Sequence, residues 1–173
     1  MKVLEKSYLE RAIFVHYGDE KYDADRVEEI SFFRNHLNKP KRGGIWLSPK
    51  DSRCGWKDWA KDSNYPRFQD KYRWEVSLKS DARIAACVDF ADFMFLPISK
   101  LFIDGQFACN YFDFGKLQES GFHGIFVGMD IIDKTAKYQT GPTSPTFRFW
   151  DCETLLLFNS EKIKKVTNYE KGC

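Results

Sequence analysis

Short runs of apolar residues, many of them β-branched or aromatic, recur along the chain and predict strands. The clearest pattern is at residues 72–78, where Tyr72, Trp74, Val76 and Leu78 alternate with charged or polar residues. That alternation is typical of a strand with one buried face. Further strands are expected at residues 13–18, 45–48, 83–89, 122–127 and 150–158.

Helical spacing of apolar residues is less common. Val27, Ile30, Phe33 and Leu37 fall on one face of a helix expected at 23–37, which Asp23 or Asp25 can cap. Shorter helices or turns are expected at 55–65, 89–101 and 113–120, the last of them ending at Gly121.

Residues 129–148 are mostly polar and contain Gly141, Pro142 and Pro145, so they predict a long loop, a feature that is usually functional in compact domains. Short strands outnumber helices along the chain. The pattern therefore predicts an α+β fold of two small, mainly antiparallel sheets with a few short helices.

Length and composition narrow the classes of protein. The 173 residues predict a single domain over 1–173. Aromatic residues make up 17% of the chain and 27 Lys+Arg balance 25 Asp+Glu, which argues against a disordered tail and against nucleic-acid binding by overall charge. Apolar runs such as 155–158 are far shorter than the roughly 18–20 residues of a membrane span, so no membrane partner is expected.

The cysteines and the amino terminus bear on the compartment. Five cysteines, an odd number without a C-x-x-C pair, predict reduced thiols and no zinc site. Cys87 and Cys152 lie in apolar segments and are expected to pack as small hydrophobic residues. Residues 1–6 lack the apolar core of a signal peptide, so a cytoplasmic location is expected.

Three short segments carry the candidate chemistry: 15–18, 44–49 and 150–155. His16 beside a strand end fits a structural role as well as a functional one, and Trp46 on a short strand fits a core position. Glu153 precedes an apolar strand, where a carboxylate needs a partner. It therefore caps, pairs with a cation or acts on a substrate.

The order of these segments resembles the ADP-ribosyltransferase superfamily. His-Tyr-Gly on a first strand, Gly-Ile-Trp followed by a serine, and a glutamate opening an apolar final strand are similar to the branch that contains diphtheria toxin and the poly(ADP-ribose) polymerases. The chain also resembles small bacterial and phage proteins with Gly-Trp-Lys-Asp-Trp and Trp-Asp-Cys runs. The resemblance spans residues 13–158 and implies a transferase that consumes NAD without a metal, in a toxin, phage or effector protein.

The resemblance also implies roles in NAD binding. His16 would bond a ribose hydroxyl, and the backbone at Tyr17 and Gly18 would bind the nicotinamide amide. Trp46 takes the place of the family's tyrosine, so it keeps an aromatic face for the nicotinamide ring and loses the phenolic hydroxyl. Ser48 lies just beyond it. Stacking of a cationic ring on an indole contributes about 0.5–2 kcal/mol.

Further roles follow from the same resemblance. Trp56 or Trp59 would form the second stacking wall, although their spacing departs from the family pattern. Glu153 would be the catalytic carboxylate, because a fixed negative charge stabilises the oxocarbenium-like transition state. Asp151 and residues 129–148 would face a macromolecular acceptor, protein or nucleic acid; Asp151 also fits a solvated strand end.

Three alternatives stay open. An enzyme similar to the RNA 2′-phosphotransferases would share the fold but needs several basic residues around its phosphate. A non-catalytic module would use the same pocket to bind a nucleotide or a protein. A hydrolase or a cysteine nucleophile is the weakest alternative, since Cys54 lacks a local signature and the aspartates are scattered: Asp89, Asp92, Asp104, Asp113 and Asp130.

Overall fold

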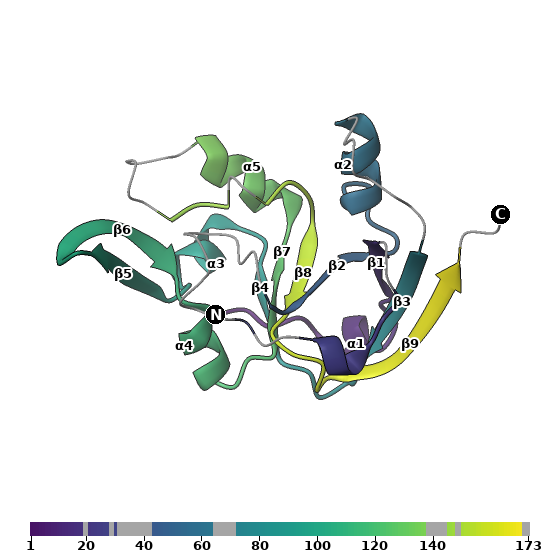
Figure 1. The fold of residues 1–173 in the computed structure, drawn as a ribbon. Coiled ribbons are helices and arrows are strands. Elements are labelled where there is room, and N and C mark those ends of the chain that lie inside the picture. Colours follow the sequence, from purple (N-terminus) through teal and green to yellow (C-terminus); the bar gives the residue numbers. More distant parts are fainter. Residues whose placement is uncertain are drawn as a thin grey trace.

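The computed structural model describes residues 1–18, 21–27, 30, 43–63, 72–137, 145–147 and 150–170. Seven of the described strands form one sheet in the order β4-β7-β8-β2-β1-β3-β9, and two more form a separate hairpin, β5-β6 (Figure 1). The strands are β1 (Phe14–Gly18), β2 (Ile45–Pro49), β3 (Tyr72–Leu78), β4 (Ile84–Cys87), β5 (Ile98–Ile103), β6 (Gln106–Phe112), β7 (Gly124–Val127), β8 (Thr154–Leu157) and β9 (Ile163–Glu170).

Short helices accompany the sheets. They are α1 (Lys6–Leu9), α2 (Trp56–Asp62), α3 (Phe90–Met94), α4 (Phe114–Glu119) and α5 (Met129–Lys137), with a 3₁₀ turn at Ala24–Arg26. All paired strands are antiparallel except β4 and β7. The expected α+β class, with two mainly antiparallel sheets and short helices, is therefore confirmed; one sheet is much larger than the other.

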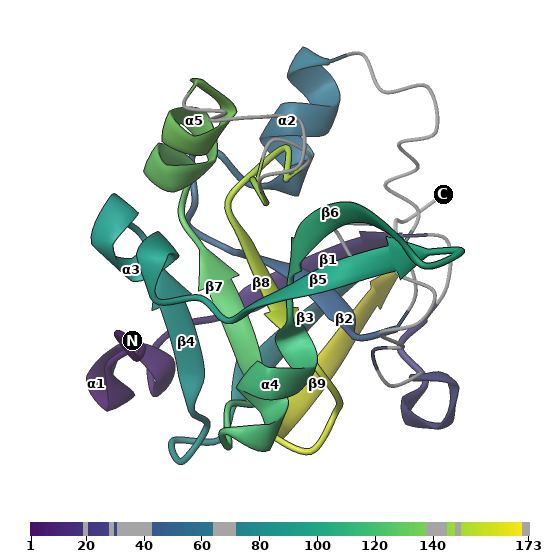
Figure 2. The same cartoon turned by 90° about the vertical axis from the view of Figure 1, so that its left-hand side faces the viewer.

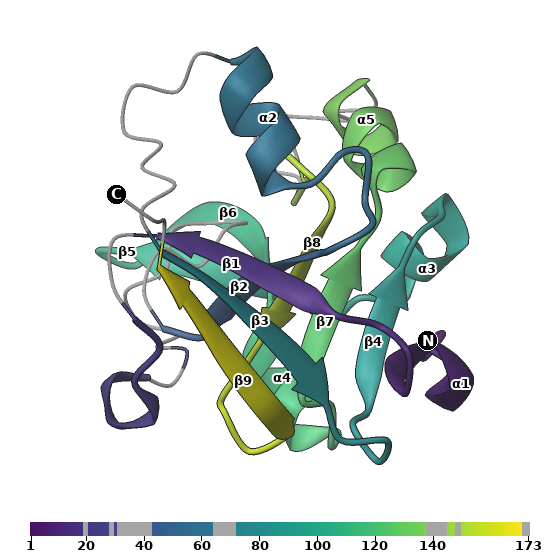
Figure 3. The same ribbon diagram turned by 90° about the vertical axis from the view of Figure 1, so that its right-hand side faces the viewer.

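The large sheet is weakly joined at its middle. Strands β1 and β2 pair through two residue pairs, Phe14 with Pro49 and Val15 with Ser48, whereas β1 and β3 pair through five. Beyond Val15 the two strands separate. Figures 1 and 3 show the result: β4, β7, β8 and β2 form one group, and β1, β3 and β9 form a second group inclined to it.

The large sheet has an apolar core on each face. Alternation along β8 sends Leu156 to one face and Leu155 to the other. The Leu156 face packs against Phe147 and Trp150, both fully buried, and the Leu155 face packs against Phe14. Both cores therefore hold β8 in place, which fixes the segment immediately before it.

Most expected elements are present with small changes in their bounds. The strand at 72–78 has the expected limits, and α2 and α4 lie within the expected helices. Gly121 has φ +79°, the left-handed conformation expected at the end of α4. The strand expected at 150–158 is shorter, since only Thr154–Leu157 pairs with neighbouring strands.

Two expectations need correction. Residues 129–137 form α5 rather than part of a loop, because Ile131, Ile132 and Thr135 share a buried face despite the intervening charges. The helix expected at 23–37 does not begin as expected: Asp23 caps only a 3₁₀ turn, and Val27 is extended. The remainder of that helix lies largely outside the described residues, as do 138–144 and 148–149 of the expected loop.

The hairpin β5-β6 was not expected from the sequence, and neither were α1 and β9. Asp104 and Gly105 form the two-residue turn between β5 and β6, with φ +50° and +77°, values that suit a tight hairpin turn. Figure 2 shows the hairpin crossing in front of the large sheet. Several large apolar side chains on it are exposed: Ile98, Phe102, Ile103 and Phe107.

Two smaller observations complete the fold. Within the described ranges, no helix has both the length and the apolar character needed to cross a bilayer. Cys87 and Cys152 are buried, as expected, and burial raises the pKa of the Cys87 thiol to about 12. Cys54 is a free, exposed thiol, and Cys173 lies outside the described residues.

Candidate functional site

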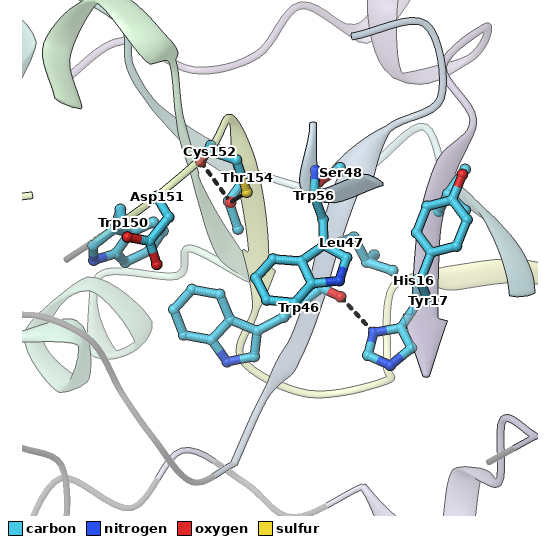
Figure 4. Close-up of a pocket in the computed structure, with 11 residues that line it drawn as sticks. His16, Tyr17, Trp46, Leu47, Ser48, Trp56, Trp150, Asp151, Cys152 and Thr154 are labelled. Carbon is cyan, nitrogen blue, oxygen red and sulfur yellow. Dashed lines mark hydrogen bonds between the residues drawn. The ribbon is translucent and has the colours of Figure 1, made fainter. Parts of the chain in front are cut away.

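A pocket of about 320 Å³ opens where β1 and β2 separate (Figure 4). This volume lies at the lower end of the roughly 300–1,000 Å³ typical of ligand pockets. Four elements, β1, β2, α2 and β8, and the segment before β8 contribute its walls, which are mainly aromatic and apolar. The lining residues are Val15, His16, Tyr17, Trp46, Leu47, Ser48, Trp56, Trp150, Asp151, Cys152 and Thr154.

His16 connects the two sides of the separation. Its Nδ1 lies 2.8 Å from the carbonyl oxygen of Trp46, and Figure 4 shows this bond crossing between the strands. A carbonyl only accepts, so Nδ1 carries the proton and donates. In the neutral ring, Nε2 is then left as an acceptor.

The surroundings of His16 favour that neutral form. Its ring stacks on Trp74, with centroids 4.3 Å apart, and Tyr22 packs against the same indole at 5.0 Å. Burial lowers the pKa of His16 below its ordinary value of 6.5, and the bond to the Trp46 carbonyl opposes this only in part. Near pH 7 the imidazole is therefore an uncharged hydrogen-bond acceptor.

Indole rings form much of the remaining wall. Trp46 lies 4.9 Å from Trp150 between ring centroids, at a tilt of 52°. Trp56 stacks on Trp59 at 4.8 Å and 30°, but Trp59 does not itself line the pocket. Figure 4 shows the Trp46 and Trp56 indoles between the Trp150–Asp151 segment and the β1 side chains. The structure thus brings Trp56 to the pocket and places Trp59 behind it.

Ser48 holds two walls together. Its buried hydroxyl donates to the carbonyl of Glu153 at 3.2 Å and accepts from the backbone N–H of Trp56 at 3.0 Å. The first bond fixes the segment before β8, and the second fixes the start of α2. A side chain at Gly55 would put its Cβ 3.3 Å from the Ser48 Cβ, so the small residue permits this close approach.

Asp151 reaches the pocket because its neighbours are anchored in the core. Trp150 is fully buried, and its backbone N–H donates to the carbonyl of Phe147 at 2.7 Å. Phe147 in turn stacks on Phe112 with centroids 4.6 Å apart. The buried aromatic residues leave Asp151 at the pocket wall, where Figure 4 shows its carboxylate beside the Trp150 ring.

Glu153 is not among the residues that line the pocket, although its carbonyl accepts a hydrogen bond from Ser48, which does line it. Its N–H donates to the Cys54 carbonyl at 2.9 Å. Thr154 does line the pocket, and adjacent residues of an extended segment point to opposite sides. The structure therefore places Asp151, rather than Glu153, in the lining of the pocket that His16 and Trp46 also line.

The pKa of Tyr8 responds to the charge of Glu153. Burial, followed by the charges of Glu153 and Asp51, raises the pKa of Tyr8. Tyr8 packs edge-on against Phe14, in the core of the Leu155 face. The charge of Glu153 therefore acts on Tyr8, a residue packed against the core of the Leu155 face.

Other expected residues fall close to the pocket. Tyr17 lines it, with the Lys57 Nζ 5.9 Å from its ring centroid. Gly18 ends β1 and pairs with Tyr72. Among the described residues, no cluster of three or more His, Cys, Asp or Glu could hold a metal ion.

Sequence reasoning missed several pocket residues. Val15, Cys152 and Thr154 line the pocket, and the ring of Trp74 stacks on the imidazole of His16. The alternation of β3 identified Trp74 as a buried residue but did not show that it contacts His16 on β1. Thr154 could have been found by extending the alternation of the apolar strand backwards from Leu156.

Comparisons with known proteins give no further information on this site. No protein-family model, curated protein or solved structure matches the chain.

Proposed function

We propose that the pocket binds the nicotinamide–ribose end of NAD and that the protein is an ADP-ribosyltransferase with the corresponding fold. The carrying observation is that the three segments of the resemblance lie on consecutive strands, β8, β2 and β1, and border one pocket. Because the second segment ends at residue 49 and the third begins only at residue 150, their order along the chain did not require this proximity.

The chemistry of the walls fits the proposed ligand. His16 accepts a hydrogen bond from a ribose hydroxyl through Nε2, because Nδ1 is committed to the Trp46 carbonyl. Trp46 and Trp56 offer aromatic faces to the cationic nicotinamide ring. The small volume encloses one end of the dinucleotide and leaves the rest outside.

Asp151 is the carboxylate that lines the pocket. During transfer the bond between nicotinamide N1 and ribose C1′ breaks, and its electron pair leaves with neutral nicotinamide. A lone pair of the acceptor forms the new bond to C1′, and the acceptor's proton passes to Asp151 or to water. A fixed carboxylate in a largely apolar pocket stabilises the positive charge that develops on the ribose.

The test measures nicotinamide release from NAD by chromatography. Wild type is expected to release nicotinamide, and Asp151→Asn to release it at least about 100-fold more slowly while binding NAD with nearly unchanged affinity. Asp133→Asn, on the exposed side of α5, is the matched control. If Glu153→Gln abolishes release and Asp151→Asn does not, the assignment of the carboxylate is reversed. Absence of release from wild type contradicts the transferase.

The placement of Glu153 favours a second candidate, a non-catalytic binding module on the same pocket. A module of this kind needs the indole walls and His16 but no carboxylate aimed at the ribose. Its expected signature is saturable NAD binding by calorimetry without nicotinamide release, and with equal affinity in Asp151→Asn.

A further inference from the structure

One face of β1, β3 and β9 continues directly from the pocket. Residues that pair across antiparallel strands share a face, and Val15 pairs with Glu75, which pairs with Thr167. The next row pairs Tyr17 with Arg73 and Arg73 with Tyr169. We call these rows, with Lys165 opposite Ser77 and with Lys50, the pocket-side face.

Cations predominate on the pocket-side face. Lys50 and Arg73 both lie against Glu75 Oε1, at 3.0 and 3.3 Å. The Glu75 side chain is only 9% exposed, whereas Lys50 and Arg73 are 43% and 37% exposed. Lys165 is exposed as well. Three cations thus reach solvent around one buried carboxylate, so the face has a local positive charge that the balanced composition of the chain conceals.

Tyrosine rings accompany these cations. The guanidinium of Arg73 lies 4.7 Å from the centroid of the Tyr169 ring, which is 41% exposed. On the other side of Arg73, Tyr17 has Lys57 within 5.9 Å of its ring. Adjacent strands lie about 4.8 Å apart, so the row Tyr17–Arg73–Tyr169 spans about 10 Å. An aromatic and cationic row of this kind suits unstacked bases and phosphates.

We propose that the pocket-side face binds single-stranded nucleic acid and that this strand is the acceptor of the transferase. The acceptor assignment rests on the proposed function; the binding surface does not. Tyr17 belongs both to the row and to the pocket wall, so a strand lying on the face leads to the reacting ribose. A nitrogen or oxygen of the nucleic acid would form the bond to C1′ as nicotinamide leaves, and its proton would pass to Asp151 or water.

A single strand fits better than a duplex or an acidic protein. Stacking on Tyr17 and Tyr169 requires bases with free faces, which a duplex does not offer. An acidic peptide would pair with the cations but would gain little from the Tyr17 and Tyr169 rings on either side of Arg73. Phosphates and bases satisfy both.

The binding test uses fluorescence anisotropy with fluorescein-labelled single-stranded DNA and RNA oligonucleotides of mixed sequence. Tyr169→Ala and Lys165→Glu are each expected to weaken binding at least about fivefold, the lower limit for losing one stacked base or one reversed charge. Phe102→Ala and Lys100→Glu, at exposed positions on the hairpin, are the matched controls and should bind like wild type. Added salt should weaken binding by wild type.

The outcomes separate the surface from the reaction. If wild type does not bind the oligonucleotide at about 100 µM, the weak limit of non-specific binding, the proposed binding surface is wrong. It is also wrong if the hairpin controls weaken binding as much as the variants on the pocket-side face. With NAD labelled in its adenine, label on the oligonucleotide supports the acceptor assignment. Label on protein alone overturns that assignment and leaves the transferase intact. Oligonucleotide binding without nicotinamide release supports the surface and contradicts the proposed function.

Discussion

The Nδ1 of His16 donates to the carbonyl oxygen of Trp46 across 2.8 Å, at the place where β1 and β2 no longer pair. One hydrogen bond thus fixes the tautomer of the imidazole, its orientation and the width of the pocket between the two strands. The remaining ring nitrogen is the part of His16 that can serve a ligand.

His16→Asn separates these two roles. The amide nitrogen of asparagine takes the place of Nδ1 and retains the bond to the Trp46 carbonyl, but no atom replaces Nε2. We expect NAD affinity to fall about tenfold, the loss of roughly one hydrogen bond, with little change in thermal stability. Calorimetry and thermal unfolding measure the two. A variant that unfolds early yet binds NAD normally would assign His16 to the fold alone.

The lowered pKa of His16 also predicts a pH dependence of stability. The unfolded chain takes up a proton near the ordinary pKa of 6.5, whereas folded His16 does so only at lower pH. The associated stability is fully present above about pH 6.5 and is lost as the pH falls toward the folded pKa. Urea unfolding from pH 8 to pH 5 should show this loss in wild type and a smaller one in His16→Asn; parallel profiles would contradict it.

Ser48→Ala should weaken both the fold and the pocket. It leaves the Trp56 N–H and the Glu153 carbonyl without the hydroxyl that joins them, at an expected cost of about 1–3 kcal/mol in unfolding free energy. Ser52→Ala is the matched control, because its hydroxyl accepts from the Cys54 N–H in a more exposed place. Chemical denaturation measures the loss of unfolding free energy in both variants. Equal losses would contradict the role of the Ser48 hydroxyl in joining the two segments.

Trp46→Ala removes a wall of the pocket and should reduce NAD affinity by about 1–3 kcal/mol, the usual loss for an aromatic anchor. Trp59→Ala removes an indole that stacks on Trp56 from outside the pocket and should reduce affinity less. Titration by intrinsic fluorescence or calorimetry measures both variants. If the Trp59 variant loses as much, the assignment of Trp46 as a stacking face fails.

Glu153→Gln reports on the position of its own side chain. Removing this charge should lower the pKa of Tyr8, because the Glu153 carboxylate is one of the causes that raise it. The pKa can be followed by NMR with ring-labelled tyrosine, and Asp133→Asn should leave it unchanged. If the pKa of Tyr8 is the same in wild type and in Glu153→Gln, the Glu153 carboxylate is again a candidate for the pocket.

Local patterns in the sequence predicted most individual strands but not which strands pair or which side chains contact each other. The alternation at 72–78 defined β3 because one face is polar and the other apolar. It could not show that Trp74 supports His16, since that contact depends on the pairing of β1 with β3. Charged residues hide the buried face of α5 from the apolar pattern, whereas Asp104–Gly105 is a strong local signal for the hairpin turn.

The candidate site illustrates how much depends on one residue of register. The sequence identified the segment 150–155 and the strands that meet it. Which carboxylate enters the pocket depends on the parity of β8, set by Leu155 and Leu156 in opposite cores. Asp151 does not follow the alternation of β8, because it lies before the strand begins and its neighbour Trp150 is buried in the core.

The two residue pairs that join β1 to β2 have a consequence for how the protein responds to its ligand. A molecule that contacts His16 on one side and Trp46 on the other adds a connection between two groups of strands that share little backbone pairing. Binding stabilises the state in which both groups are in place. Backbone amides of β1 and β2 should then exchange with deuterium more slowly when the pocket is occupied, and those at the exposed turn of the hairpin β5-β6 should not change.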